Sequence, residues 1–484
     1  MAQTLSTLQA RYPLYLANQP VETGQWLTVT DKYTHQPVSQ VALADAALLD
    51  RAIAAAAQAE PALRTLKTHQ KQAILQHAVR RFTEWTERLV EVLVVEGGKP
   101  VQAARAEVAR LISTFQLAAD AVTQLPQGEV LPLDVTPAAA RYRGMSQRVP
   151  VGACALISPF NFPLNLAAHK VAPAIAAGCP FILKPASLTP IGALLIGQAL
   201  AETDLPPGAF SILPCEREAA DLLVTDDRLK LLSFTGSDQV GWDMKARAGR
   251  KKVVLELGGN AAVLLDEDTD VAAAMDRLVT GAFVQSGQVC ISVQRVLVVA
   301  SRYAEVRDQL VQRARQLRPG DPRQPATVVG PMIKTREAER LKGWIDEAVA
   351  QGATLLCGGQ LEGAMLEATV LENVPADCHL GRDEAFGPVV VLASVPDFDT
   401  GLQRINASRF GLQAGVYTQR IDRMMQAWDQ LEVGGVVIND VPTFRVDNMP
   451  YGGLKDSGLG REGIRYAIED MTELRLLVIA QPQR

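Results

Sequence analysis

Cys290 stands three residues after a glycine, at the end of residues 285–290 (Gln-Ser-Gly-Gln-Val-Cys). A carboxylate, Glu256, lies 34 residues earlier, and the pair Gly258 and Gly259 follows it after one leucine. A thiol and a carboxylate that are each set beside a glycine turn suit a nucleophile and a base that share one cleft. The alternative interpretation is a buried cysteine and a surface glutamate, because free cysteine is among the most buried residue types.

A third stretch, residues 158–163 (Ser-Pro-Phe-Asn-Phe-Pro), favours the chemical interpretation. Its two prolines and two phenylalanines predict a stiff, non-helical turn around Asn161, from which a side-chain amide can be aimed. A rigid amide donor is what a developing oxyanion needs. The three stretches therefore offer a thiol, a carboxylate and an amide of suitable types, each in a turn set by glycine or proline.

In this order and spacing, the three stretches resemble the aldehyde dehydrogenase superfamily. The resemblance continues over nearly the whole chain, through residues 234–237 (Phe-Thr-Gly-Ser), 384–388 (Glu-Ala-Phe-Gly-Pro) and 451–458 (Tyr-Gly-Gly-Leu-Lys-Asp-Ser-Gly). Each motif alone is a weak signal, whereas six motifs in order are a strong one. In length and motif set the chain is similar to lactaldehyde, sulfolactaldehyde and non-phosphorylating glyceraldehyde-phosphate dehydrogenases.

The resemblance implies a role for each of the three residues. The Cys290 thiolate attacks the aldehyde carbon, and the Asn161 amide and the Cys290 backbone N–H hold the resulting oxyanion. A hydride then leaves for the nicotinamide and gives a thioester. Glu256 activates the water that hydrolyses this thioester to the carboxylic acid.

The resemblance also implies NAD or NADP as cofactor. Lys184, after a predicted buried strand, would reach the adenosine ribose, although a solvated lysine at a strand end is the alternative. Glu384 would bind the nicotinamide ribose, and Phe386 would pack near the ring. Residues 234–241 leave a strand and open a helix, so amides there can face a pyrophosphate. The predicted cofactor-binding residues are Lys184, Ser187, Phe234, Gly236, Ser237, Gly241, Leu257, Glu384 and Phe386.

Ser187 leaves the choice between NAD and NADP open. Strict NAD enzymes of the family often carry a glutamate at this position to bind the ribose hydroxyls, whereas serine need not repel a 2′-phosphate. A second stretch, residues 458–463 (Gly-Leu-Gly-Arg-Glu-Gly), fits the dinucleotide fingerprint literally. It follows a glycine-rich loop rather than an apolar strand, so we do not expect a phosphate loop there.

Two arginines, Arg110 and Arg445, are candidates to bind an anionic aldehyde. The alternative for each is an ordinary solvent-exposed arginine. Val289 stands where some phosphate-binding family members carry arginine, which disfavours a phosphorylated substrate.

Composition limits the remaining functions. The net charge of −5 and the isoelectric point near 5.7 argue against nucleic acid or a membrane surface as partner. Residues 1–13 are largely polar, which disfavours a secretory segment. The six cysteines form no CxxC pair, so we expect neither a disulfide framework nor a metal site, and a reducing cytoplasm fits best.

The apolar pattern predicts the elements that position these residues. Residues 13–21 predict a hairpin, and residues 43–60, 69–97 and 103–123 predict long helices. Apolar runs at 153–157, 180–183, 209–213, 231–234 and 253–255 alternate with helical patterns, and the alternation returns over residues 281–441. Such a rhythm is typical of parallel, doubly wound sheets, which bind ligands beyond their strand ends.

The predicted fold class is α/β, and the resemblance implies an aldehyde dehydrogenase fold of three parts. These are a Rossmann-like cofactor domain (1–128 and 151–256), an α/β catalytic domain (257–445) and a small β oligomerisation arm (129–150 and 465–484). In the family the arm pairs with the carboxy-terminal strand, which residues 474–480 match. A homodimer or homotetramer is therefore expected, with the cleft between the two larger domains.

Two other functions compete with hydrolytic aldehyde oxidation. In a CoA-acylating dehydrogenase, CoA rather than water takes the acyl group, but that branch tends to lack the base, so Glu256 argues against it. A non-catalytic structural or binding protein on the same fold is the other alternative. Loss of Cys290, Asn161 or Glu256 would have favoured it, and all three residues are present.

Overall fold

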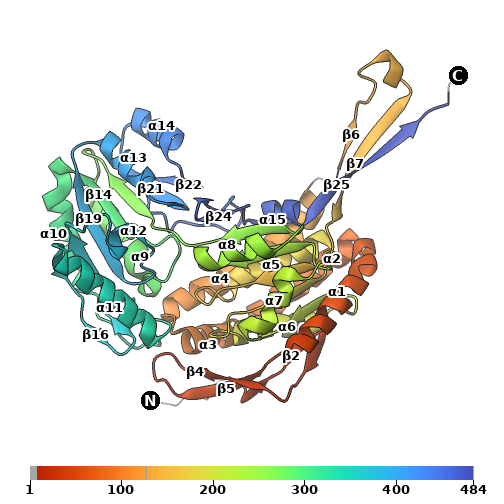
Figure 1. The fold of residues 1–484 in the computed structure, drawn as a ribbon, viewed down its shortest axis with the longest axis horizontal. Helices are drawn as coiled ribbons and strands as arrows, with labels where there is room; N and C mark the ends of the chain where they lie inside the picture. Colours follow the sequence, from red (N-terminus) through yellow and green to blue (C-terminus); the bar gives the residue numbers. More distant parts are fainter. Residues whose placement is uncertain (1–7, 126–127, 483–484) are drawn as a thin grey trace.

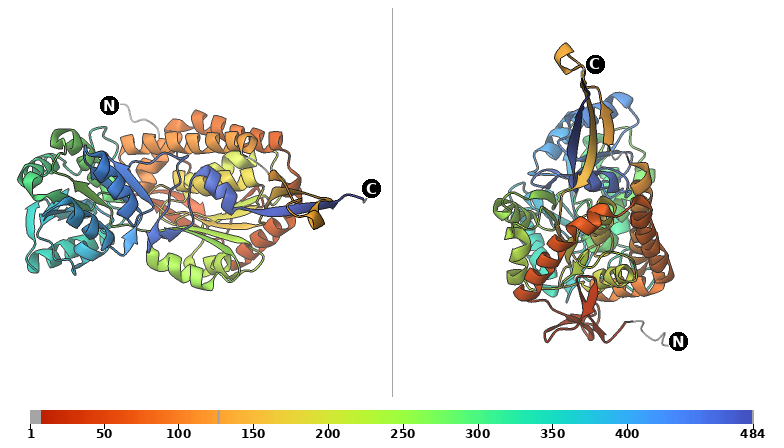
Figure 2. Two further views of the ribbon diagram at one scale, coloured as in Figure 1. Left: turned by 90° about the horizontal axis from the view of Figure 1, so that it is seen from above. Right: turned by 90° about the vertical axis from the view of Figure 1, so that its right-hand side faces the viewer.

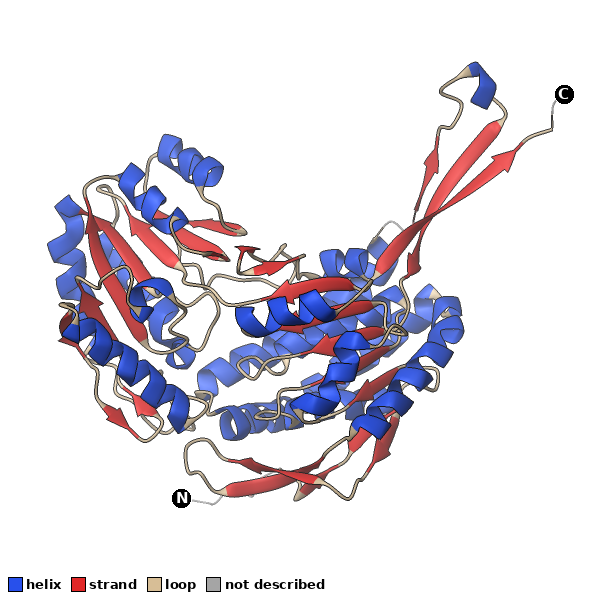
Figure 3. Ribbon diagram, viewed as in Figure 1, coloured by secondary structure: helices blue, strands red, loops and turns tan. Residues whose placement is uncertain are grey.

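The chain folds into two helix-covered sheets with a projecting arm. The computed structural model describes residues 8–125 and 128–482, so the extreme ends of the predicted cofactor and arm ranges lie outside the described residues. The two sheets lie side by side, and a narrow three-stranded arm extends from the first lobe (Figure 1). Figure 3 shows that helices flank the strands of both lobes, which is the mixed α/β architecture that the sequence predicts.

The first sheet carries most of the predicted cofactor residues. Its five central strands, in the order β12-β11-β8-β9-β10, run parallel. All five coincide with the predicted apolar runs. They are β8 (Cys154–Ile157), β9 (Phe181–Lys184), β10 (Phe210–Ile212), β11 (Leu231–Thr235) and β12 (Lys252–Glu256).

Antiparallel strands close both edges of this sheet. The predicted hairpin is confirmed as β2 (Leu14–Leu16) and β3 (Gln19–Val21), joined by two residues with positive φ, Ala17 and Asn18. At the other edge, β24 (Gly458–Leu459) pairs with β12. A separate small sheet near the amino terminus contains β1 (Arg11–Tyr12), β5 (Pro37–Ala42) and β4 (Trp26–Thr30).

Helices cover both faces of the first sheet. One face packs against α2, α3, α4, α5 and α6, and the other against α1, α7 and α8. The prediction of one helix over residues 69–97 is wrong, because the chain breaks at Trp85 and the apolar spacing simply resumes in the next helix. The bounds are α1 (Ala46–Thr65), α2 (Thr68–Glu84), α3 (Thr86–Gly97), α4 (Val101–Gln124), α5 (Asn165–Ala177), α6 (Ile191–Ala201), α7 (Arg217–Thr225) and α8 (Asp238–Arg247).

The second sheet has the order β15-β18-β19-β14-β13-β21-β22 and is parallel except at β15. Helices α9 and α10 pack on one face, and α13 and α14 lie on the other (Figure 1). The strands are β13 (Ala262–Leu265), β14 (Arg295–Val299), β15 (Thr354–Cys357), β18 (Thr369–Glu372), β19 (Val389–Val395), β21 (Gln413–Tyr417) and β22 (Gly435–Ile438). The helices are α9 (Val271–Phe283), α10 (Tyr303–Ala314), α11 (Thr335–Ala350), α12 (His379–Arg382), α13 (Phe398–Asn406) and α14 (Ile421–Gln430).

The arm is a three-stranded antiparallel sheet that projects from the body in both views of Figure 2. Strand β7 (Tyr142–Pro150) lies between β6 (Gly128–Leu131) and β25 (Thr472–Ala480). The predicted pairing of the late apolar run with this segment is confirmed. Eight consecutive positions of β25, residues 473–480, are exposed, although five of them are large and apolar: Leu474, Leu476, Leu477, Val478 and Ile479.

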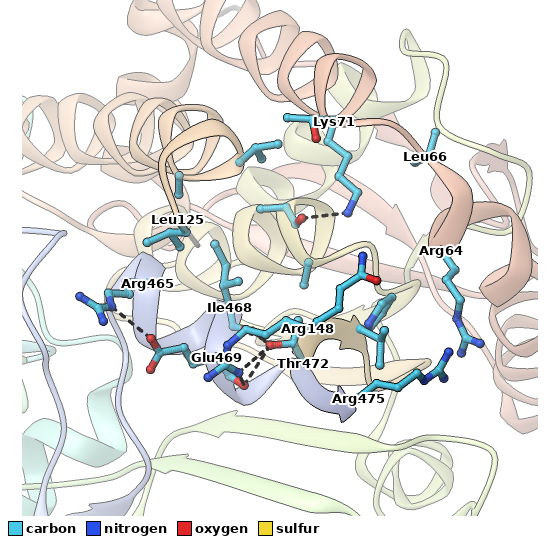
Figure 4. A pocket seen from close by; sticks show the side chains of 18 residues that line it. Arg64, Leu66, Lys71, Leu125, Arg148, Arg465, Ile468, Glu469, Thr472 and Arg475 are labelled. Atoms are coloured by element: carbon cyan, nitrogen blue, oxygen red, sulfur yellow. Dashed lines mark hydrogen bonds and ion pairs between the residues drawn. The ribbon is translucent and has the colours of Figure 1, made fainter. Parts of the chain in front are cut away.

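A pocket of about 560 Å³ lies at the root of the arm and is rich in basic side chains (Figure 4). Lys71 donates a hydrogen bond to the Ala176 carbonyl at the end of α5, and Arg148 donates to the Glu469 carbonyl near the end of α15 (Ile464–Asp470). Cations are favourable beside helix carboxyl ends. These two side chains therefore fasten the helices on which the arm rests.

None of the described helices is long and apolar enough to cross a bilayer.

Candidate active site

The site forms at the carboxyl ends of the first sheet's parallel strands. Ile157 on β8 pairs with Lys184 on one side and with Phe234 on the other, so both predicted cofactor residues lie level at one edge. The strand order reverses between β8 and β11, because β9 continues on one side of β8 and β11 on the other. Ligands of open α/β sheets bind at such a reversal.

The link between the two sheets runs through this edge. Glu256 ends β12, and β13 begins at Ala262, so the chain crosses within five residues. Both glycines of the link are in close contact with other site segments. A Cβ on Gly258 would lie 2.4 Å from the Glu384 carboxylate, and one on Gly259 would lie 2.5 Å from the Cys290 carbonyl oxygen. Only glycine allows the backbone to come this close to its neighbours. The glycine pair predicted to form a turn after Glu256 is therefore required for steric reasons.

The loop that carries Cys290 is tightly wound. Gln285, Ser286 and Gly287 all have positive φ (53°, 56° and 66°), which non-glycine residues rarely adopt. A Cβ on Gly287 would lie 2.1 Å from the Gly387 carbonyl oxygen. The glycine before the cysteine is therefore required both by its conformation and by its neighbour.

The turn at residues 158–163 is non-helical, as predicted, and holds Asn161 against the cysteine loop. The Asn161 side-chain amide donates a hydrogen bond to the Gln288 carbonyl at 3.0 Å. The Gln285 side chain donates in return to the Asn161 carbonyl. The structure thus joins the predicted amide and the predicted thiol loop by two hydrogen bonds.

Cys290 is half-buried, and its Sγ lies 2.9 Å from the hydroxyl of Tyr451. Burial raises the pKa of the Cys290 thiol to about 11, while the hydrogen bond with Tyr451 and the charge of Arg445 act in the opposite direction. The other five cysteines are buried and free.

Glu256 is 3% exposed, and neither of its carboxylate oxygens has a hydrogen-bond partner among the described residues. Burial raises its pKa well above the ordinary value, and the neighbouring Glu462 adds to the rise. A buried, unpaired carboxylate with a raised pKa is a typical general base.

Three buried charged residues lie behind Glu256. Glu462 bonds to Lys170 at 3.2 Å and to Arg445 at 2.9 Å. Burial raises the pKa of Glu462, but the charges of Lys170 and Arg445 outweigh it and bring the pKa to about 2. Sequence reasoning missed Lys170, Glu462 and Tyr451. Lys170 could have been noticed as the one lysine of a helix in which every residue is buried.

Both predicted anion-binding arginines are ion-paired rather than simply solvated. Arg110 on α4 bonds to Asp447 at 2.6 Å, and Arg445 is only 7% exposed at its side chain. Asp447 also accepts hydrogen bonds from Asn165 and His169. Asp447 thus holds Arg110, and Glu462 holds Arg445, so both arginines are fixed at or beside the segment 445–447.

The predicted cofactor residues line the same edge. A Cβ on Gly236 would lie 2.5 Å from the Phe234 ring, and one on Gly241 would lie 2.4 Å from Leu257, so α8 packs closely on the strand ends. Ser237 precedes α8 and makes no side-chain capping bond in the described chain, so the first helical N–H groups remain open to an anion.

Four further predicted cofactor residues lie near the same strand ends. Lys184 at the end of β9 donates to the Pro185 carbonyl, and Ser187 is half-buried three residues later. Glu384 accepts a hydrogen bond from the Gly259 N–H at 3.0 Å, and burial raises its pKa to about 8. Phe386 meets Phe160 edge to face at 5.8 Å.

The structure thus places a thiol, a carboxylate and an amide at the carboxyl edge of a parallel sheet, and comparison with known proteins identifies the family. The model of the aldehyde dehydrogenase family matches residues 20–477. The chain is 37% identical to the 3-sulfolactaldehyde dehydrogenase of Priestia aryabhattai over 477 residues, which cover 98% of this chain and 99% of that protein.

Solved structures give the same result. Aldehyde dehydrogenase 21 of Physcomitrella patens, in complex with the reaction product succinate, superposes with a TM-score of 0.96 at 45% identity, covering 98% of this chain and 99% of that one. The NADP complex of glyceraldehyde-3-phosphate dehydrogenase from Methanocaldococcus jannaschii superposes with a TM-score of 0.91 at 35% identity, covering 95% and 100%.

The chain belongs to the aldehyde dehydrogenase family. It is an NAD(P)-dependent aldehyde dehydrogenase, which oxidises an aldehyde to the carboxylic acid.

The cysteine loop generates the first prediction. Gly287→Ala should lower the free energy of unfolding by more than about 1 kcal/mol and reduce aldehyde oxidation at least tenfold, because the loop must shift to relieve both strains. The matched control is Gly343→Ala on the exposed face of α11, where a Cβ meets nothing within 4 Å. It should stabilise the protein slightly, by ~0.5–1 kcal/mol. Equal activity in the two variants would contradict the proposed tight loop.

Proposed function

We propose that this enzyme oxidises a short aldehyde that carries a second, anionic group, with Cys290 as nucleophile, Asn161 as oxyanion donor and Glu256 as base. The observation that carries the proposal is the convergence of these three side chains, from three distant segments, at the edge where the two sheets meet.

Cys290 performs the first step. Its thiolate attacks the aldehyde carbon, and the oxygen that gains the charge takes hydrogen bonds from the Asn161 amide and the Cys290 N–H. The Asn161 amide is already aimed at the cysteine loop by its contact with Gln288. Little reorganisation is then needed when the charge develops, which is the condition for efficient oxyanion stabilisation.

Glu256 performs the second step. As a buried carboxylate without a partner in the described chain, it can take a proton from the water that hydrolyses the thioester. Its raised pKa means that the base form is gained only as the pH rises, so deacylation becomes faster towards alkaline pH. The ion-paired Glu462 behind it keeps a low pKa, so the two carboxyl groups have separate roles.

The residues at the strand ends fit a dinucleotide. The open amino end of α8 suits its pyrophosphate, Lys184 its adenosine ribose and Glu384 its nicotinamide ribose. When bound, NAD(P)+ would supply the hydride acceptor that the oxidation needs.

Two observations support an anionic substrate. Arg110 on α4 is joined to Asp447, two residues after Arg445, and Arg445 lies over the ring of Tyr451, whose hydroxyl is beside the Cys290 sulfur. The compounds for which the relatives are named, or with which they were crystallised, are also all anions: succinate, sulfolactaldehyde and glyceraldehyde 3-phosphate. Val289 before the cysteine favours a carboxylate or sulfonate over a phosphate.

The arm supports self-association. β25 is an edge strand with consecutive exposed apolar residues, and such strands rarely remain uncovered. We infer a homodimer or homotetramer, whose mass light scattering would measure. The six free cysteines fit a reducing compartment such as the cytoplasm.

Replacing the base should separate the two half-reactions. In Glu256→Gln, one equivalent of reduced cofactor per active site should appear in a burst, followed by very slow turnover, because the thioester persists. Mass spectrometry of the quenched protein should locate an acyl group on Cys290. Glu362→Gln, an exposed control on β16 (Leu361–Glu362), should behave as the wild type. Full turnover in Glu256→Gln would assign the base elsewhere.

Charge recognition can be tested with matched aldehydes. The kcat/KM for 4-oxobutanoate, whose oxidation gives succinate, should exceed that for butanal by roughly 10–100-fold, which is the usual worth of a charge-assisted contact. Arg110→Gln should collapse this ratio. Arg105→Gln, on the same helix but exposed and paired with Glu87, is the control and should keep it. A ratio near one in the wild type would overturn the anionic substrate but not the aldehyde chemistry.

Ser187 predicts that NADP is accepted. A carboxylate there, ~4 Å from a 2′-phosphate, would give a repulsion of about 4 kcal/mol at an effective dielectric of ~20, which solvent reduces to ~1–2 kcal/mol. Ser187→Glu should therefore lower kcat/KM for NADP roughly tenfold while NAD is still used. Ser187→Gln separates size from charge and should change the NADP/NAD ratio much less. An unchanged ratio in Ser187→Glu would show that this residue does not face the ribose.

A further inference from the structure

A hydrogen bond to the reacting sulfur has no assigned role in the mechanism above. The Tyr451 hydroxyl lies 2.9 Å from the Cys290 Sγ, and its ring is 3% exposed within a small apolar cluster that includes Val289, Ile291 and Leu412. A hydroxyl fixed this closely to a nucleophile necessarily influences the sulfur.

We propose that Tyr451 is a catalytic residue, whose hydroxyl donates a hydrogen bond to the Cys290 thiolate and, polarised by Arg445, sets the reactivity of the nucleophile. The proposal rests on Cys290 being the nucleophile, but not on the identity of the substrate.

The backbone fixes the position of Tyr451. Tyr451 and Glu462 form an isolated antiparallel bridge, in which each backbone N–H donates to the other carbonyl. The Glu462 side chain in turn holds Arg445 at 2.9 Å. One residue therefore places both the phenol and the cation that acts on it.

Arg445 lies over the ring of Tyr451, with its guanidinium carbon 3.7 Å from the ring centroid. A cation on an aromatic face is attracted to the ring, and its field draws charge away from the hydroxyl. This makes the hydroxyl a stronger donor. Arg445 thus acts on the sulfur through Tyr451 as a positioning residue, besides any contact with substrate.

The direction of the hydrogen bond follows from the two partners. Burial raises the pKa of Tyr451 well above its ordinary value, so the phenol keeps its proton, and once the thiol ionises the sulfur can only accept the hydrogen bond. Arg445, Glu256 and Glu384 are the other charged groups acting on Cys290, and the two carboxylates oppose thiolate formation. Tyr451 is then the one direct hydrogen-bond donor recorded for this sulfur in the described chain.

The test is alkylation of the free enzyme by iodoacetamide, which is neutral and needs neither aldehyde nor cofactor. Pulses of a few seconds from pH 6 to 12, with Cys290 labelling counted by peptide mass spectrometry, give a rate profile that levels off as the thiol ionises, because burial raises its pKa to about 11. In Tyr451→Phe the levelling should move up by about one pH unit. At pH 7 the rate should fall only roughly threefold to tenfold, because a more basic thiolate is also more nucleophilic.

The matched control is Tyr417→Phe. Tyr417 is also buried, on β21, and its hydroxyl has no hydrogen-bond partner in the described chain. Its profile should superpose on that of the wild type. If Tyr451→Phe is slower by the same factor at every pH and levels off where the wild type does, the role of Tyr451 is structural and the proposal is overturned.

A second variant covers the case in which Tyr451→Phe does not fold. Arg445→Lys keeps the charge opposite Glu462 but loses the planar group on the ring. Its profile should also move to higher pH. Arg445→Lys should cause a smaller shift in the Tyr451→Phe background than in the wild type, because both changes act through the same hydroxyl. An unmoved profile in Arg445→Lys overturns the action of Arg445 through the ring. Because no aldehyde is present, this result is independent of whether the substrate is an anion.

Discussion

The structure depends on the close crossing of Gly258 and Gly259 from the first sheet to the second. There the backbone passes within contact distance of the Cys290 carbonyl and the Glu384 carboxylate, and no side chain fits. This one crossing brings together the end of β12, which carries Glu256, and the loop that carries Cys290. Glu256 and the Cys290 loop can therefore lie close together because these two residues lack a Cβ.

A second constraint is the burial of charge around this crossing. Glu256, Glu462, Lys170 and Arg445 are all buried within one network. An isolated buried charge is strongly unfavourable, so such groups either pair or become neutral. Glu462 pairs and keeps a low pKa, whereas Glu256 has no hydrogen-bond partner among the described residues and its pKa rises. The separation of the two pKa values is a consequence of geometry, and it suits Glu256 to the role of base proposed for it.

The two arginines combine a structural role with a placement that suits the substrate recognition proposed for them. Arg445 neutralises Glu462, stacks on Tyr451 and lies near Cys290. Arg110 is held by Asp447, whose other partners include the buried His169. A guanidinium has five donors, so an ion pair at one edge does not use up its capacity. Fixed cations of this kind are well suited to orient an anionic substrate without rearrangement.

The sequence by itself predicted the parallel strands, the hairpin and the residues of chemical interest, whereas the arm pairing followed from the family resemblance. Apolar runs, turn residues and ordered motifs are local patterns, which can be recognised in the sequence without knowledge of the fold. The prediction of a single helix over residues 69–97 is wrong, because the apolar spacing continues across the break at Trp85. Only the tertiary structure showed that Tyr451 meets Cys290, 161 residues away, and that Glu462 meets Lys170 across 292 residues. The stretch around Glu462 even imitates a dinucleotide fingerprint, yet its first glycine serves to let β24 approach β12. Contacts between residues so far apart in the sequence depend on how the two sheets pack against each other. The spacing of residues along the chain does not reveal that packing.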